Sequence, residues 1–148
     1  MKKTTALIMM VLFLALIVYA CAQKEEEKEM AMAADPAAEL AKSVANGMKL
    51  FNDKELGTSG LTCNSCHMEG GTKDGKMGET VVPAWDNLAP KYPQYFMMAK
   101  RVMTLEQVVQ FCIVNPLKGK ALAWDDQKLT DLTAYCASVK KMEKKMEK

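Results

Sequence analysis

The pentapeptide Cys63-Asn64-Ser65-Cys66-His67 constrains this chain more than any other part of its sequence. Two cysteines separated by two residues and followed at once by a histidine form the attachment signature of a c-type haem. The spacing allows both sulfurs to form thioethers with the vinyl groups on one edge of a porphyrin, and it places the next side chain for axial binding to the iron. We therefore predict that Cys63 and Cys66 hold one covalent haem c and that His67 is its proximal iron ligand.

Two other chemistries use closely spaced cysteines, and each meets a specific difficulty here. A thioredoxin-like redox pair belongs to a βαβ unit, a pattern that is absent around this motif. A zinc site needs two more ligands at close spacing, whereas Cys112 and Cys136 stand alone. The chain has a single histidine, so coordination of the iron by two histidines is excluded by count.

The N-terminus carries an export pattern. Lys2 and Lys3 precede an unbroken apolar run over residues 6–20, which is typical of a secretory signal and too short to span a bilayer comfortably. The run ends in Val18-Tyr19-Ala20-Cys21, which resembles a bacterial lipobox, so residues 1–21 are predicted to be a signal peptide that leaves Cys21 lipidated. Tyr19 is bulkier than the usual residue, and a retained anchor or an ordinary cleaved signal are the alternatives. We expect the domain in the bacterial periplasm or at the cell surface, held to a membrane by its lipid anchor.

Composition divides the rest of the chain into three parts. Residues 22–35 offer almost nothing to bury and are predicted to be a flexible tether. Residues 36–139 have the size of one small domain, and residues 140–148 form a charged tail. Without Lys2 and Lys3, 18 basic residues stand against 18 acidic ones. Nucleic-acid binding therefore has no electrostatic support.

Helical periodicity begins before the haem motif. Asp35-Pro36 is typical of an N-cap and first helical residue, and an apolar stripe follows that predicts a helix over residues 36–52. The stripe consists of Leu40, Val44, Met48 and Phe51. Gly47 lies four residues before Phe51, so the two share a face on which another helix can approach closely.

Two more helices are predicted after the motif. Thr104 and Gln107 fit a capping box, and the helix that they begin should end near Asn115-Pro116. Its apolar face consists of Leu105, Val108, Val109 and Cys112. Asp125 or Asp126 then caps a last helix. The apolar stripe of that helix consists of Leu129, Leu132, Cys136 and Val139.

The segment between these helices supplies candidate walls for the haem pocket. Residues 69–79 contain four glycines and are predicted to be a mobile surface loop. A proximal histidine usually donates its other ring N–H to a carbonyl, and we expect the Pro83 carbonyl to accept it. Trp85, Tyr92 and Tyr95 are expected to line the pocket, because aromatic residues dominate burial in a domain of this size.

A helix before the motif, a helix at the C-terminus and little strand signal between them resemble the class I cytochrome c fold. This resemblance implies an all-α domain, a small fold of helices around one covalent haem. In that family the first and last helices cross near a glycine and an aromatic residue. Gly47, Phe51 and Tyr135 occupy the matching positions here.

The same family usually takes its distal methionine from the loop before the last helix. Residues 115–124 contain no methionine, and Leu117 stands where one is expected. Three upstream methionines are candidates instead, namely Met97, Met98 and Met103. The chain has 13 methionines, so packing is the ordinary role of any one of them.

A second resemblance offers another distal ligand. Several segments are similar to the haem domains of thiosulfate dehydrogenases and of the A subunit of the Sox thiosulfate-oxidising system. They are Tyr92-Pro93, Thr104-Leu105-Glu106, Cys112, Gly119-Lys120-Ala121-Leu122 and Leu132-Thr133-Ala134-Tyr135. In those families a cysteine at the position of Cys112 binds the iron. Val108-Val109 departs from the family pattern. The alternatives are a disulfide between Cys112 and Cys136, which an oxidising compartment would permit, and two independent buried thiols.

These observations favour a monohaem c-type cytochrome that transfers single electrons between redox proteins of the periplasm or membrane. The alternative is a haem-thiolate subunit of a sulfur-compound oxidation system, which the second resemblance implies. A haem-bearing sensor is a third possibility, supported only by the tether. Because methionine ligation raises the reduction potential of a haem and thiolate lowers it, the distal ligand decides which partners the protein can serve.

Overall fold

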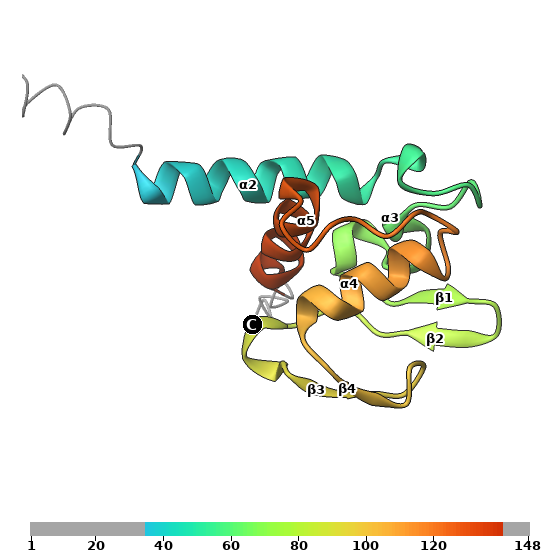
Figure 1. Cartoon of the computed structure of the whole chain (residues 1–148). Helices are drawn as coiled ribbons and strands as arrows, with labels where there is room; N and C mark the ends of the chain where they lie inside the picture. The colour runs from blue at the N-terminus through green and yellow to red at the C-terminus, as the bar shows by residue number, and fades with distance from the viewer. Residues whose placement is uncertain (1–34, 141–148) are drawn as a thin grey trace, which may run out of the picture. The chain divides into compact units, whose positions relative to one another are not determined.

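The computed structural model describes residues 35–140, and from Glu39 onward these form one compact unit. The predicted signal peptide with Cys21, most of the tether and nearly all of the tail lie outside the described residues. Figure 1 shows the order of the elements along the chain. The helices are α2 (Pro36–Phe51), α3 (Cys63–Cys66), α4 (Leu105–Val114) and α5 (Gln127–Ser138). The strands are β1 (Gly75–Met77), β2 (Thr80–Val82), β3 (Gln94–Phe96) and β4 (Arg101–Met103). Short 3₁₀ turns occupy Lys54–Leu56, Glu69–Gly71 and Ala89–Lys91.

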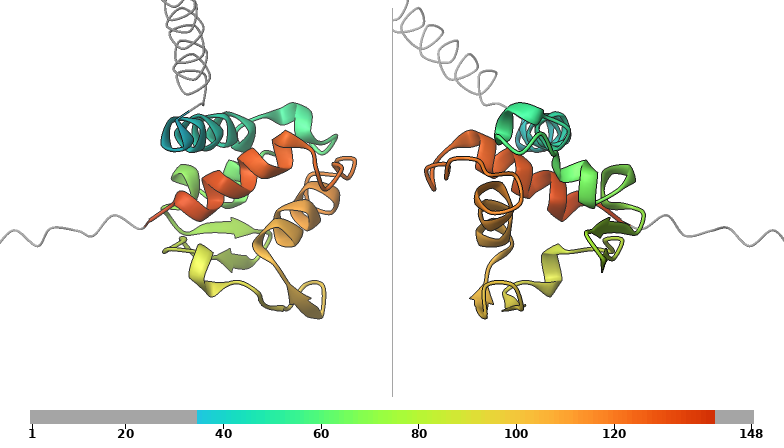
Figure 2. Two further views of the ribbon diagram at one scale, coloured as in Figure 1. Left: turned by 60° about the vertical axis from the view of Figure 1, so that its left-hand side comes forward. Right: turned by 90° about the vertical axis from the view of Figure 1, so that its right-hand side faces the viewer.

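The first and last helices cross where the sequence predicts. Gly47 of α2 lies against the backbone of Asp131 and the Cβ of Tyr135 on α5, with no room between them for a side chain. One turn further on, the Phe51 and Tyr135 rings pack with centroids 5.2 Å apart. Figure 2 shows the two helices crossing in both views. The resemblance to class I cytochromes therefore predicted this contact correctly.

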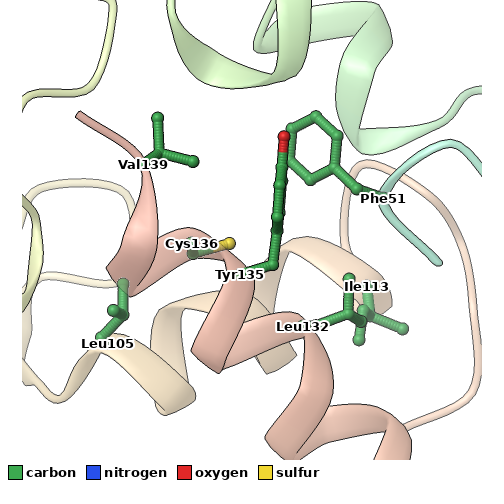
Figure 3. Packing of buried hydrophobic residues seen from close by; sticks show 7 residues of the cluster. All are labelled: Phe51, Leu105, Ile113, Leu132, Tyr135, Cys136 and Val139. Atoms are coloured by element: carbon green, nitrogen blue, oxygen red, sulfur yellow. The ribbon is translucent and has the colours of Figure 1, made fainter. Parts of the chain in front are cut away.

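The hydrophobic core lies between α2, α4 and α5 (Figure 3). Its buried members are Phe51, Leu105, Ile113, Leu132, Tyr135, Cys136 and Val139. All four residues of the predicted α5 stripe are buried. The α2 stripe was only partly right, because Leu40 and Met48 are more than half exposed. That helix contacts the domain through its C-terminal half, where Gly47 and Phe51 are its two buried residues.

The predicted helix caps are present in the structure. Thr104 Oγ1 accepts a hydrogen bond from the Gln107 amide at 3.3 Å, and Gln107 Oε1 accepts one from the Thr104 amide at 3.0 Å. Asp126 caps α5 by accepting from the Lys128 amide at 2.9 Å. Each side chain satisfies an amide that the first helical turn leaves without a backbone partner.

The helices are joined by two β-hairpins, so the all-α expectation was too narrow. β1 pairs with β2 and β3 pairs with β4, each antiparallel and three residues long. The first hairpin replaces part of the predicted mobile loop, and Gly78 supplies the positive φ of 60° that its tight turn needs. Three-residue strands are too short to show a period-two pattern, which is why little strand signal is visible in the sequence. Across residues 35–140, no helix combines the length and apolar character needed to cross a membrane.

Candidate haem site

The Cys-x-x-Cys-His motif folds as one helical turn. Cys63 to Cys66 form α3, and the His67 amide closes the turn by donating to the Cys63 carbonyl at 2.9 Å. At the start of the turn, the Thr62 amide donates to Ser65 Oγ at 3.0 Å. Residues three apart on a helix share a face, so this turn presents both thiols to the same side.

Both thiols and the His67 ring line one cavity of about 370 Å³. This volume lies in the usual range for small-molecule and cofactor sites. The predicted α4 face forms another part of its wall, through Leu105, Val108, Val109 and Cys112. Trp85 and Tyr92 line it as expected, but Tyr95 does not and is 55% exposed. Tyr95 belongs to the outer face of the β3–β4 hairpin because side chains alternate along a strand.

Aromatic packing orients the His67 imidazole. Its ring centroid lies 4.4 Å from that of Trp85 and 6.4 Å from that of Phe51. Burial lowers the pKa of His67 to about 4, so the ring is neutral at pH 7 and retains a lone pair for a metal. Its Nδ1 atom is buried and has no hydrogen-bond partner. The predicted hydrogen bond to the Pro83 carbonyl is therefore wrong for this structure, although Pro83 lines the cavity. The Trp85 ring instead packs against the imidazole at an interplanar angle of 45°.

The four candidates for the distal iron ligand differ in whether they line the cavity. Cys112 and Met98 line the cavity, whereas Met97 and Met103 do not. Met97 is 76% exposed at the tip of the β3–β4 hairpin, and Met103 is packed into the protein interior, 2% exposed. Met98 lines the cavity while remaining half exposed. Met77 of β1 also lines the cavity. It was not predicted as a site residue, because it lies in a segment predicted to be a loop.

The cysteines of the site are unpaired, and burial raises the pKa of three of them. The four described cysteines are free, so the alternative disulfide between Cys112 and Cys136 is not formed in this structure. Burial, together with the neighbouring Cys66 thiol, raises the pKa of Cys112 to about 11. Burial and the adjacent Cys112 raise the pKa of Cys63 to about 12. Burial likewise raises the pKa of Cys136, which lines the same cavity.

The loop before α5 is held to the body of the domain by its backbone. Leu117, which stands where a methionine is usual, is buried and lines the cavity. Its carbonyl accepts from the Ser59 amide at 3.0 Å. The buried Gln110 amide group pairs with both the N–H and the C=O of Leu122. This segment therefore closes the cavity with an apolar side chain.

The residues present fit a covalently attached haem. Two free thiols on one helical turn and a buried, neutral imidazole with an unpartnered nitrogen all border one cavity. The rest of the described lining is almost entirely apolar and aromatic, which suits a porphyrin face. Cys63 and Cys66 would hold the group and His67 would bind its iron.

Comparison with known proteins agrees with this geometry. Residues 46–144 match the family model described as SoxA/TsdA, cytochrome c domain. The chain is 31% identical over 106 residues to a thiosulfate dehydrogenase from Allochromatium vinosum, covering 68% of this chain and 38% of that protein. It is 28% identical over 105 residues to a thiosulfate dehydrogenase from Psychrobacter arcticus, covering 68% of this chain and 30% of that protein.

The alignments span less than two-fifths of the length of these relatives, and so leave most of each relative without a counterpart in this chain. The family match, by contrast, covers about two-thirds of the chain and includes the haem motif, the cavity wall on α4 and the whole of α5. A cytochrome c domain implies covalently bound haem c. The chain therefore belongs to the SoxA/TsdA cytochrome c domain family.

Proposed function

We propose that this protein is a monohaem c-type cytochrome that passes single electrons between redox proteins of the periplasm or cell surface. The observation that carries the proposal is the convergence of Cys63, Cys66 and His67 on one apolar cavity. The motif occurs once in the sequence, which corresponds to one haem. When bound, the haem supplies a one-electron couple at its iron.

The chain's own residues hold and shield that group. Cys63 and Cys66 anchor it, Trp85 orients the His67 ring, and the apolar walls exclude water from the iron. Among the described residues, no carboxylate or ammonium group lines the cavity, so the site offers little for acid–base catalysis. This composition favours electron transfer over bond-breaking chemistry.

We assign Cys112 as the distal iron ligand. It is the candidate that lines the cavity from a regular helix, whereas Met98 lies at the exposed tip of a hairpin. A metal deprotonates a coordinating thiol outright, so the raised pKa of Cys112 in the unligated thiol does not oppose this role. Thiolate ligation lowers the reduction potential of a haem relative to methionine.

The mass of the denatured protein and the optical and EPR spectra of the oxidised protein test this assignment. The denatured chain should retain one haem, and acidified solvent should not extract it. The oxidised iron should be low-spin with thiolate character. Cys112→Ser should abolish that signature and Cys112→Met should raise the reduction potential, while Cys136→Ser and Met98→Leu leave both unchanged. A methionine-type spectrum that Met98→Leu removes would instead make Met98 the ligand.

A second candidate function is a haem-thiolate component of sulfur-compound oxidation. It is favoured by the thiosulfate dehydrogenase relatives and by the place of Cys112 in the cavity. Mixing the oxidised wild-type protein with thiosulfate should then reduce the haem, and Cys112→Ser should remove this reaction. A haem that small redox dyes reduce but thiosulfate does not would leave electron transfer as the function.

We further propose that Cys21 is lipidated and holds the domain at a membrane through residues 22–35. Two or more acyl chains anchor a protein stably, where a single chain is marginal. Cys21→Ser should release the cytochrome from membranes or leave an uncleaved precursor. A wild-type protein that is soluble without detergent and begins after residue 21 contradicts the proposal.

A further inference from the structure

Charge is distributed unevenly along the described chain. Residues 87–124 contain five basic side chains, Lys91, Lys100, Arg101, Lys118 and Lys120, against one acidic side chain, Glu106, a net formal charge of +4. Residues 35–86 contain eight acidic and five basic side chains, a net charge of −3. The ion pairs within residues 35–140 are Lys42–Glu39 and Lys73–Glu69, so none of the five basic groups of residues 87–124 is neutralised by a described neighbour.

Exposed apolar side chains gather in the same part of the chain. Eleven large hydrophobic residues of the described structure are exposed, and four of them lie within eight residues. These four are Tyr95, Met97, Met98 and Val102. Tyr95 and Val102 are direct cross-strand partners, so they form one continuous surface on the outer face of the β3–β4 hairpin. Scattered exposed hydrophobic residues need no explanation, but a contiguous group beside a functional cavity indicates an interaction surface.

The other face of the same hairpin borders the haem cavity. Gln94, Phe96 and Met98 line it, and the Phe96 ring packs on Phe111 of α4 with centroids 5.4 Å apart. Figures 1 and 2 show the hairpin at the end of the domain away from α2. A protein resting on its outer face would therefore be separated from the cavity by a single two-stranded layer.

We propose that the outer face of the β3–β4 hairpin, with Tyr95 and Val102 at its centre, is the docking surface for a redox protein with an acidic rim around an apolar patch. The exposed basic side chains of Lys100, in the turn of the hairpin, and Arg101, on the strand position next to Val102, lie at the edge of this face. The proposal rests on the proposed function of electron carrier and names the partner chemistry of that site. The partner accepts one electron from the ferrous haem, or returns one to the ferric haem, and no bond forms or breaks.

The physical requirements of such a partner favour this surface. Electron carriers must bind briefly, which small interfaces with apolar centres and polar rims permit. Complementary charge raises the association rate 10- to 1,000-fold without requiring tight binding. Lys100 and Arg101 are exposed and carry this charge, whereas Tyr95 and Val102 provide the apolar contact.

Stopped-flow oxidation of the full-length, haem-loaded ferrous protein tests the charge. The probes are anionic hexacyanoferrate(III) and cationic tris(phenanthroline)cobalt(III), each of which takes up one electron. At low salt the double variant Lys100→Glu/Arg101→Glu should react about tenfold more slowly with the anion and faster with the cation, and both effects should fade at high salt. The neutral variant Lys100→Gln/Arg101→Gln should lie between it and the wild type.

The matched control is Lys49→Glu/Lys54→Glu. It changes net charge by the same amount at exposed positions on α2 and the following turn. At about 0.1 M ionic strength, where the Debye length is about 10 Å, its rates should remain within about twofold of the wild type, because exposed charges beyond that length are largely screened. If this control slows the anionic probe as much as the hairpin variant does, only net charge matters and the docking surface is wrong.

An acidic blue-copper protein as oxidant tests the apolar contact. Tyr95→Thr/Val102→Thr should slow this protein probe about tenfold while leaving both small complexes unaffected. An unchanged rate with the copper protein overturns the proposal. The proposal is also overturned if the wild-type protein is a dimer in sedimentation equilibrium and this variant dissociates it, because a second copy of the chain would then cover the surface.

Every variant must keep the wild-type haem spectrum and reduction potential. A wild-type haem that exchanges electrons with none of the three probes would refute the electron-carrier function itself.

Discussion

Gly47 and Asp131 meet backbone to backbone where α2 crosses α5. A Cβ atom added at Gly47 would clash with the carbonyl oxygen of Asp131. A side chain at residue 47 must therefore push the helices apart. The crossing carries Phe51 and Tyr135 into the core, and Phe51 also lines the haem cavity. Phe51 therefore belongs both to the helix contact and to the lining of the haem site.

Gly47→Ala should lower the free energy of unfolding despite the better helix propensity of alanine. Overpacking against backbone costs about 1–3 kcal/mol, and the propensity gain of about 1 kcal/mol offsets part of it. Urea unfolding of the haem-loaded protein measures the difference. Lys49→Ala, at an exposed position of the same helix, should change stability by less than about 0.5 kcal/mol. Equal stability of wild type and Gly47→Ala would mean that the helices do not cross at this residue.

The buried carboxylate at this crossing predicts an acid-dependent loss of stability. Ser43 Oγ and Gln127 Nε2 donate to Asp131 Oδ1 at 2.6 and 2.7 Å. Burial would raise the pKa of Asp131, but these hydrogen bonds outweigh it and hold the pKa below its ordinary value of 3.8. The unfolded chain therefore takes up the proton at higher pH, and the free energy of unfolding should fall as the pH drops below 3.8.

Ser43→Ala tests this linkage. It should lower stability by about 1.5–3 kcal/mol at neutral pH, because it removes a hydrogen bond to a charged group, and it should flatten the acid-dependent loss. Thr130→Ala, at an exposed position of α5, is the control and should keep the wild-type pH profile. Parallel pH profiles for wild type and Ser43→Ala would show that this hydrogen bond does not hold the pKa down.

Trp85 is expected to set the orientation of His67. Trp85→Ala should cost on the order of 3 kcal/mol of stability through lost packing, and freeing the imidazole should shift the EPR g-values of the oxidised haem. Trp85→Phe should restore most of the wild-type spectrum because it keeps a ring against the histidine. Trp124, 60% exposed, provides the control, since Trp124→Ala should change neither property. Unchanged g-values in Trp85→Ala would indicate that another group orients the ring.

The free state of Cys112 and Cys136 can be measured directly. Alkylation of the denatured, haem-loaded protein without reductant should add two labels, one at each of these thiols, beside whatever Cys21 contributes. Cys136→Ala should cost roughly 1 kcal/mol, in line with a small buried side chain, and the cost should not depend on reductant. Equal losses of about 2–4 kcal/mol for Cys112→Ala and Cys136→Ala, both abolished by reductant, would indicate a disulfide.

Local sequence rules correctly predicted the elements that are specified by residues close together in the chain. The haem motif, the capping box at Thr104, the Asp126 cap and the boundaries of α2, α4 and α5 depend on residues a few positions apart. The α4 face from Leu105 to Cys112 follows from helical period alone, and all four of its predicted members line the cavity.

Contacts between segments far apart in the sequence determined the features that these local rules did not predict. Two three-residue hairpins are stabilised by pairing and by packing on helices, which no local pattern records. The same pairing turned Tyr95 outward and Phe96 toward the cavity. The choice among Met97, Met98, Met103 and Cys112 as cavity residues depends on distances between distant segments. The packing of His67 against Trp85, in place of a Pro83 hydrogen bond, depends on them too. Sequence alone predicted haem attachment at Cys63 and Cys66, because covalent attachment needs only local spacing, whereas only the folded chain determined which side chains line the cavity beside them.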